Sequence, residues 1–363
     1  MDTPRARRAV GLLPPLATSG IGSLPHTQQE LALQSALQMD VPYLPQLPVG
    51  RPSEFMIASA LDGLPGLTFD DEGMCTVDLA FWSEHQQAFS TALEEALAKG
   101  DTRPFEPSAQ ACRAWRPFLW ELENRKLALA RVQLAGPCTV RWVTKTSEGA
   151  AASEVLLLEK QILRLLWARS LSMVRALRRL GVTPLFFFDE PGLYALNGTD
   201  ARHLLALQEL KILVISLQRE GALVGVHCCS NTDWPKVLEM GLDVLSLDVR
   251  LSLDAVLEHR EAFLRFWESG ATLSLGLLPT DLSSEYRVPE LVESVEASLR
   301  ALWPQGNPWS ENLSRMLLTP ACGLGLRSVK DAERILGQLR DAQGLLKRLL
   351  PAAEAFPVSS TPP

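Results

Sequence analysis

Short apolar runs rich in β-forming residues recur along this 363-residue chain, and a segment with helical spacing follows each of them. Every run ends in glycine, proline or a polar residue, as strands commonly do. The runs cover residues 17–21, 41–44, 130–134, 184–188, 223–226, 244–247, 272–275 and 316–319. Strands that alternate with helices favour a parallel sheet with right-handed crossovers. Eight such units predict an α/β fold, a (β/α)8 TIM barrel, and a doubly wound open sheet is the alternative.

The intervening segments predict the helices of this barrel, because apolar residues recur in them at helical spacing. They cover residues 28–39, 83–99, 154–180, 201–219, 253–267, 289–302 and 328–349. The span 48–106 is too long for a loop between strand and helix. We therefore expect one barrel domain over residues 1–363, with an insertion at 48–106 after the second strand that caps the barrel mouth. The tail 357–363 is rich in proline, serine and threonine and is expected to be disordered.

Composition excludes several classes of function. The net charge is -7, whereas nucleic-acid surfaces usually carry a basic excess. No apolar stretch approaches the roughly 18 residues that would suggest a membrane span. Pro14 and Pro15 interrupt the first apolar segment, which argues against a secretory signal. The six cysteines are spread through the chain rather than concentrated as in small secreted domains. We expect a cytoplasmic protein whose free thiols are available for metal binding or catalysis.

The clearest chemical motif is G-V-H-C-C-S at residues 225–230, which follows the fifth run. Side chains alternate along a strand, so His227 and Cys229 point to one side and Cys228 to the other. Imidazole and thiolate are the ligands that zinc prefers. Cys322 follows the last run and is the candidate third ligand, because barrel closure brings strand ends together. Asp248, at the end of the sixth run, is a candidate fourth ligand.

Other interpretations of this motif stay open. The histidine and cysteines could form only a buried strand end, and Cys228 and Cys229 could form a strained vicinal disulfide. A metal ion with four protein ligands would be structural, whereas an open position would admit a substrate. A substrate thiol bound there would lose its proton near neutral pH.

Asp189 and Glu190 follow a run of three phenylalanines at the end of the fourth predicted strand. A buried carboxylate needs a partner. At a barrel mouth, a substrate ammonium group is a natural partner, and the alternative is a helix N-cap or a salt bridge within the protein.

Five short motifs occur in the order found in a known family. They are I-G-S-L-P-H-T at 21–27, L-A-G-P-C-T at 134–139, D-E-P at 189–191, H-C-C at 227–229 and T-P-A-C-G-L at 319–324. Together they resemble I-G-S-F-P-Q-T, L-T-G-P-V-T, D-E-P-A, H-x-C and N-P-D-C-G-L of the cobalamin-independent methionine synthases. The resemblance extends over about residues 17–345. The wider barrel superfamily includes uroporphyrinogen decarboxylase and corrinoid-linked thiol methyltransferases.

This resemblance implies zinc on His227, Cys229 and Cys322, with a carboxylate from the sixth strand. The family has glutamate there, and the matching Asp248 is one methylene shorter.

The resemblance also implies a binding site for homocysteine. Asp189 would hold its ammonium group and Ser23 its carboxylate, and both are the expected catalytic residues. Their neighbours Gly22 and Glu190 would complete the substrate site.

The implied activity is zinc-dependent methylation of a small-molecule thiol, first of all homocysteine, to give methionine. Family members have two barrels, of which we expect only the catalytic one here, and the other half helps to hold the folate donor. Trp142 lies near a family tryptophan involved with folate, with spacing that differs by one residue. A methylated corrinoid protein is therefore an alternative donor to methyltetrahydrofolate. The competing functions are a uroporphyrinogen decarboxylase-like enzyme, which needs a basic pocket and no zinc, and a non-catalytic zinc or corrinoid accessory protein.

Overall fold

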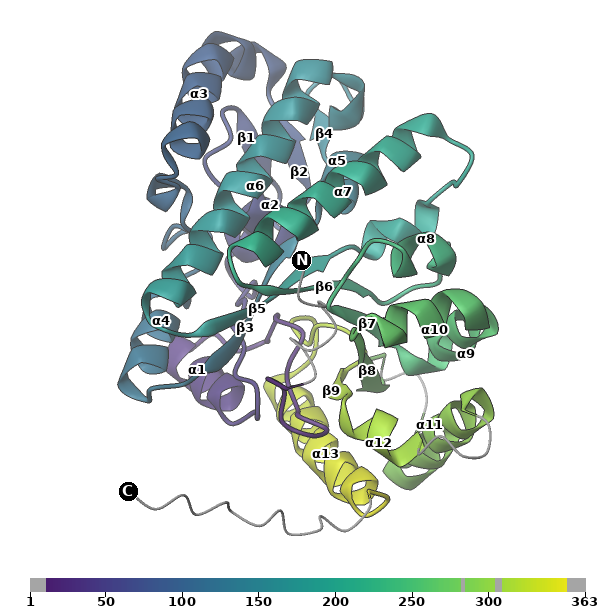
Figure 1. The fold of residues 1–363 in the computed structure, drawn as a ribbon. Helices are drawn as coiled ribbons and strands as arrows, with labels where there is room; N and C mark the ends of the chain where they lie inside the picture. Colours follow the sequence, from purple (N-terminus) through teal and green to yellow (C-terminus); the bar gives the residue numbers. More distant parts are fainter. Residues whose placement is uncertain (1–10, 282–284, 304–308, 351–363) are drawn as a thin grey trace, which may run out of the picture.

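The computed structural model describes residues 11–281, 285–303 and 309–350, and its centre is a curled parallel sheet (Figure 1). The sheet has six strands in the order β3-β5-β6-β7-β8-β9. These strands are Leu129–Ala135, Thr183–Asp189, Leu223–Cys228, Val244–Asp248, Thr272–Leu278 and Leu317–Pro320. All the neighbouring pairs are parallel. Six of the expected strands are therefore confirmed.

The strands are buried on both faces, as parallel strands covered by helices usually are. Along β6, Val224 and Val226 pack into the core between sheet and helices. Leu223 instead joins a smaller apolar cluster with Leu185 of β5 and Val244 of β7. The side chains of each strand therefore alternate between the outer face of the sheet, which the helices cover, and its inner face.

The first two expected strands are extended segments rather than regular strands. Single parallel bridges join Thr18 to Leu318 of β9 and Tyr43 to Arg131 of β3. The two segments also contact each other, because the amide of Val41 donates to the carbonyl of Thr18 at 3.0 Å. The second segment has proline at positions 42, 45 and 48. Proline has no N–H to donate, so this segment cannot form a continuous ladder.

A glycine allows these two segments to lie close together. A Cβ atom on Gly20 would lie 2.2 Å from Cζ of the Tyr43 ring. Tyr43 is 1% exposed, so its ring has little room to move.

The helices expected from the sequence are present, with one difference. They are α1 Gln29–Leu37, α3 Leu79–Lys99, α6 Leu156–Arg179, α7 Ala201–Arg219, α11 Val288–Leu302 and α13 Val329–Lys347. The segment expected as one helix at 253–267 is instead divided into α9 Asp254–Glu258 and α10 Arg260–Glu268. His259 between them has a ψ of 52°, which lies outside the helical range.

Four further helices of the described chain were not indicated by the apolar pattern. They are α4 Trp115–Asn124, α5 Pro137–Val143, α8 Trp234–Leu238 and α12 Trp309–Ser314.

Residues 48–106 form a separate group of elements beside α6. They contain α2 Met56–Ala60, an antiparallel hairpin of β1 Leu67–Phe69 with β2 Cys75–Val77, and helix α3. Strand β2 also pairs with β4 Lys145–Thr146, which follows α5.

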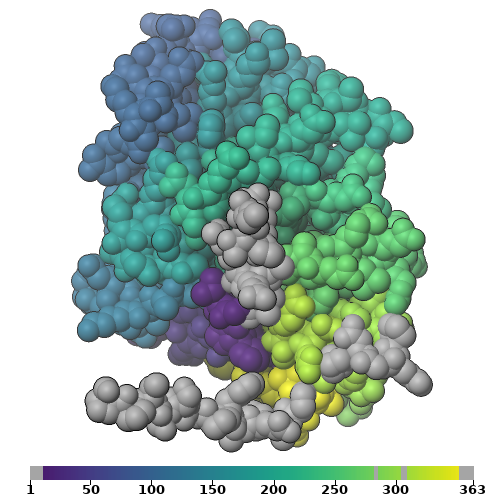
Figure 2. All heavy atoms as spheres, viewed as in Figure 1, coloured from purple at the N-terminus to yellow at the C-terminus, as the bar shows by residue number. Residues whose placement is uncertain are grey.

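The first and last described segments lie side by side. Figure 2 shows the purple N-terminal segment against the yellow C-terminal part of the chain. The amide of Leu318 donates to the carbonyl of Ala17 at 2.9 Å, and Gln343 of α13 donates to the carbonyl of Leu16 at 2.8 Å. The expected disordered tail at 357–363 lies outside the described residues. Within the described ranges, no helix combines the length and apolar character that crossing a membrane requires.

The contact between Gly20 and Tyr43 gives a test of how the N-terminal segments are held. We expect Gly20→Ala to lower the free energy of unfolding by about 1–3 kcal/mol, because the added methyl group meets a buried ring. Urea unfolding measures this change. Gly337→Ala in α13 is the control, since no atom lies within 4 Å of its added Cβ and alanine favours a helix. A Gly20→Ala variant as stable as the parent chain would contradict the packing described here.

Candidate metal centre

The candidate metal centre lies at the carboxyl ends of β5, β6 and β7. His227 is in register with Asp189 of β5 on one side and with Ser246 of β7 on the other. Cys228 is fully buried in the outer core, whereas His227 and Cys229 line a cavity. This alternation is the one predicted from the sequence.

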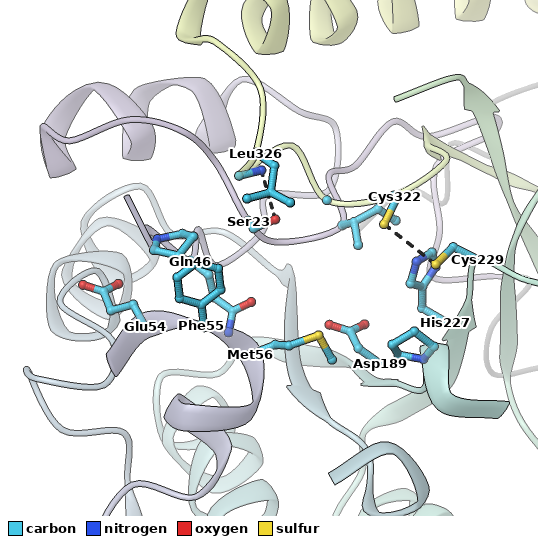
Figure 3. Close-up of a pocket in the computed structure, with 15 residues that line it drawn as sticks. Ser23, Gln46, Glu54, Phe55, Met56, Asp189, His227, Cys229, Cys322 and Leu326 are labelled. Carbon is cyan, nitrogen blue, oxygen red and sulfur yellow. Dashed lines mark hydrogen bonds between the residues drawn. The ribbon is translucent and has the colours of Figure 1, made fainter. Parts of the chain in front are cut away.

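His227, Cys229 and Cys322 come together at this place (Figure 3). One ligand atom from each lies within 4.8 Å of the others. The two sulfur atoms are 3.8 Å apart. Two thiolates bound at about 2.3 Å to one tetrahedral zinc ion would also lie about 3.8 Å apart. The spacing of the sulfurs therefore fits a shared metal ion.

The His227 ring is oriented so that one of its nitrogens could bind the same metal ion. Its Nδ1 atom forms a hydrogen bond with Oγ of Ser246 at 2.9 Å. Its Nε2 atom is buried and bonds to no oxygen or nitrogen of the described residues. With the proton on Nδ1, the lone pair of Nε2 is available to a metal ion, and Ser246 holds the ring in place.

The two cysteines share a hydrogen bond that favours ionisation of one of them. The hydrogen bond with Cys229, and then the nearby His227, lowers the pKa of Cys322 to about 4. The same hydrogen bond raises the pKa of Cys229. The contact between the two cysteines therefore favours ionisation of Cys322, and a metal ion bound to both sulfurs would displace the remaining proton. All six cysteines are free, so the vicinal disulfide considered for Cys228 and Cys229 is not formed.

Asp189 faces the cavity beside the metal cluster (Figure 3). Burial raises its pKa to about 6, although His227 and the buried Arg131 lower it. Its Oδ1 atom is buried and has no hydrogen-bond partner among the described residues. A carboxylate in this position can accept a hydrogen bond from a bound ligand.

Ser23 lies in the cavity wall and is tied to the loop that follows β9. Its Oγ atom accepts a hydrogen bond from the amide of Gly325 at 3.2 Å. A Cβ on Gly323 would lie 2.2 Å from that oxygen, so glycine is needed for the close approach. Gly22 lies behind the wall, where a side chain would collide with Gln133.

Glu190 is used inside the protein rather than in the cavity. Its carboxylate is fully buried and accepts hydrogen bonds from the amides of Cys138 and Thr139 and from the Thr139 hydroxyl. These amides belong to the first turn of α5, where helix donors have no partner within the helix. Glu190 therefore caps helix α5, which was the alternative to a role in substrate binding, and it is not among the cavity residues.

Asp248 is not part of the metal cluster. Its carboxylate accepts a hydrogen bond from the amide of Arg250 at 2.8 Å and caps the turn after β7. The structure thus brings together the other three predicted ligands.

A cavity of about 220 Å³ opens beside this cluster. Its polar wall includes Ser23, Gln46, Glu54 and Asp189. Its apolar wall includes Ile21, Pro48, Phe55, Met56 and Leu326. No lysine or arginine is among the described residues that line it.

The sequence analysis missed the cavity residues of the segment P-S-E-F-M at 52–56. Its place in the segment that follows the second predicted strand, at the end where barrels carry their functional residues, was the available signal.

Comparisons with known proteins agree with this geometry. Residues 187–344 match the family described as "Cobalamin-independent synthase, Catalytic domain", and this span includes all three residues of the cluster. No curated protein matches the chain.

Several solved structures are similar. A methyltransferase from Methanosarcina mazei is 13% identical, with a TM-score of 0.53 over 95% of this chain and 100% of that chain. This match supports the fold.

Two matches with lower TM-scores are methionine synthases. A B12-independent methionine synthase from Shewanella sp. W3-18-1, in complex with selenomethionine, is 14% identical, with a TM-score of 0.46 over 64% of this chain and 67% of that chain. A putative vitamin-B12 independent methionine synthase from Listeria monocytogenes is 13% identical, with a TM-score of 0.44 over 65% of this chain and 70% of that chain.

The role of Ser246 can be tested by metal affinity. We expect Ser246→Ala to weaken zinc binding about 10- to 100-fold, as loss of a hydrogen bond to a ligating histidine typically does. Competition with a chromogenic chelator measures the affinity. The matched control is Ser274→Ala on β8, because Ser274 is equally buried but contacts Thr319 instead. Equal zinc affinity in the two variants would show that Ser246 does not support the site.

Proposed function

We propose that this chain, whose residues 187–344 belong to the cobalamin-independent synthase catalytic-domain family, is a zinc-dependent methyltransferase that methylates a substrate thiol. Homocysteine is the first candidate acceptor, and methionine would be its product. The observation that carries the proposal is the cluster of His227, Cys229 and Cys322, with its two sulfurs 3.8 Å apart at the wall of a cavity.

The donor set supports zinc as the metal. One imidazole and two thiolates leave a fourth tetrahedral position, as catalytic zinc sites do. When bound, zinc would lower the pKa of a coordinated substrate thiol, so that the sulfur is a thiolate at neutral pH. We propose Asp248 as a ligand only if its side chain leaves the amide of Arg250.

The remaining residues would bind and orient the thiol. Asp189 would accept hydrogen bonds from the ammonium group of homocysteine, because its Oδ1 atom has no partner within the described protein. The Ser23 hydroxyl accepts from Gly325 and can donate to the substrate carboxylate. We assign Gly22 and Glu190 indirect roles, since Gly22 makes room for Gln133 and Glu190 caps α5.

The fold proposed for this function is one (β/α)8 barrel over the whole chain. The segments around Thr18 and Tyr43 would be its two irregular strands, because they bridge β9 and β3. The metal cluster would then lie at the carboxyl ends of the strands, where such barrels carry their active sites.

The methyl donor is either methyltetrahydrofolate or a methylated corrinoid protein. Decarboxylation of a substrate with several carboxylates has less support, because the cavity walls include Asp189 and Glu54 but no arginine or lysine of the described chain. A non-catalytic zinc or corrinoid accessory role is an outcome that the assays below distinguish.

Metal content is the first test. We expect about one zinc per chain in the purified reduced protein, and its loss in Cys229→Ala and in Cys322→Ala, since each removes one of only three ligands. Elemental analysis measures the content. Cys75→Ala is the control, because Cys75 is buried in the hairpin at 67–77 and lies outside the cluster. A zinc content unaffected by Cys229→Ala or Cys322→Ala would rule out this site.

Methyl transfer is the second test. The zinc-loaded protein should methylate homocysteine from methylcobalamin or methyltetrahydrofolate, as mass spectrometry of the product shows. Asp189→Asn should raise the KM for homocysteine at least tenfold and leave zinc content unchanged, because a charged hydrogen bond to the ammonium group is weakened. Binding of homocysteine without transfer from either donor would favour an accessory role.

A further inference from the structure

We propose that Arg169 is a positioning residue for the substrate cavity, which it serves by holding the short helix α2 against α6. The proposal rests on the proposed function, because it assigns a role in binding the thiol to residues 48–106. Arg169 lies in the middle of α6 and is not a cavity residue. It would therefore act through the residues that it holds.

The guanidinium of Arg169 bonds to four backbone carbonyls of this segment. Its side chain is only 3% exposed. Nη1 donates to the carbonyls of Ser59 at 3.1 Å and Ala60 at 2.5 Å, and Nη2 donates to that of Asp62 at 2.5 Å. Nε donates to the carbonyl of Phe105 at 3.3 Å. One side chain thus joins the start and the end of residues 48–106 to the same helix.

The chemistry of the contact explains why an arginine is used. Ser59 and Ala60 are the last residues of α2, so their carbonyls have no further helical turn to bond and lie at the negative end of the helix. Both residues are buried away from water. Only a planar group with several fixed donors can serve these carbonyls together, and lysine has a single nitrogen.

Helix α2 matters because it carries part of the cavity wall. Phe55 and Met56 line the cavity, and the side chain of Met56 extends toward Asp189 in Figure 3. A helix of five residues is not stable by itself, so its position depends on the contacts that hold it.

A second contact links the same helix to the cavity. The side-chain amide of Gln46, another cavity residue, donates to Oγ of Ser59 at 3.2 Å. A shift at the end of α2 would therefore move the side chains of both Met56 and Gln46, while the candidate metal ligands at the end of β6 and after β9 stay in place.

The test compares Arg169→Lys and Arg169→Met with the parent chain, with L-homocysteine as the probe. We expect the KM and the calorimetric Kd for homocysteine to rise about tenfold, with kcat changed less than threefold and zinc content unchanged. Hydrogen exchange at residues 56–62 should become faster. Arg175→Lys is the matched control on the same helix, because Arg175 contacts Glu220 and the carbonyl of Gly100. It should leave homocysteine binding unchanged.

A double-mutant cycle separates positioning from general destabilisation. Met56→Ala removes the cavity contact directly, so its effect on KM and that of Arg169→Lys should not add if Arg169 acts through α2. Additive effects, or an Arg169→Lys variant with normal homocysteine binding and normal exchange at 56–62, would overturn the proposal.

The outcomes also distinguish this proposal from the proposed function. If the parent chain transfers no methyl group, the Kd for homocysteine and the hydrogen exchange still decide the role of Arg169. If Arg169→Met does not fold, Arg169→Lys keeps the positive charge and supplies the comparison.

Discussion

The site depends on the register of three parallel strands. Asp189, His227 and Ser246 are aligned across β5, β6 and β7, so a carboxylate, an imidazole and the hydroxyl that orients it lie at one level. A slip of one residue in β6 would turn His227 toward the helices and place Cys228 at the cavity. Gly225 opposes such a slip, because a side chain brought to its place would meet the Phe187 ring of β5, which lies 2.4 Å from a Cβ built on Gly225. The packing of the sheet therefore fixes the chemistry of the cavity.

Alternation along the strands made the clustering of His227, Cys229 and Cys322 predictable. Period-two spacing placed His227 and Cys229 on one face, and the position of Cys322 after the last run placed it at the same end of the sheet. The same rule could not decide which of Asp189 and Glu190 faces the cavity, because both follow the predicted strand and both are carboxylates. The structure separates them, since a Cβ on Gly136 would lie 2.2 Å from the carboxyl carbon of Glu190. That glycine lets Glu190 reach the amides of α5. Gly136 and Glu190 are far apart in the sequence, so the local pattern could not indicate their contact.

The parts that the sequence did not predict depend on contacts between distant segments. Prolines in the second segment remove ladder donors, so local β propensity at 41–44 overestimated the regularity of that strand. The wall formed by Phe55 and Met56 depends on where α2 is held, and this is decided by Arg169 more than a hundred positions later. Arg131 is a similar case, because its guanidinium lies 3.9 Å from the centre of the Phe187 ring inside the sheet. Nothing in the local sequence around these arginines indicates which carbonyls or rings they meet.

Charge connects these features. Two buried cations lie near the cavity: Arg169 contacts carbonyls and the carboxylate of Asp62, and Arg131 lies over the Phe187 ring and partly offsets the charge of Asp189. The cavity wall presents the carboxyl group of Asp189 and the sulfurs of Cys229 and Cys322. When they are ionised in a buried site, such groups repel one another and are poorly solvated. A metal ion at the sulfurs and an ammonium group at Asp189 would relieve both costs. The charges of the cavity wall therefore favour two cationic groups bound close together, as the proposed zinc-bound aminothiol would supply.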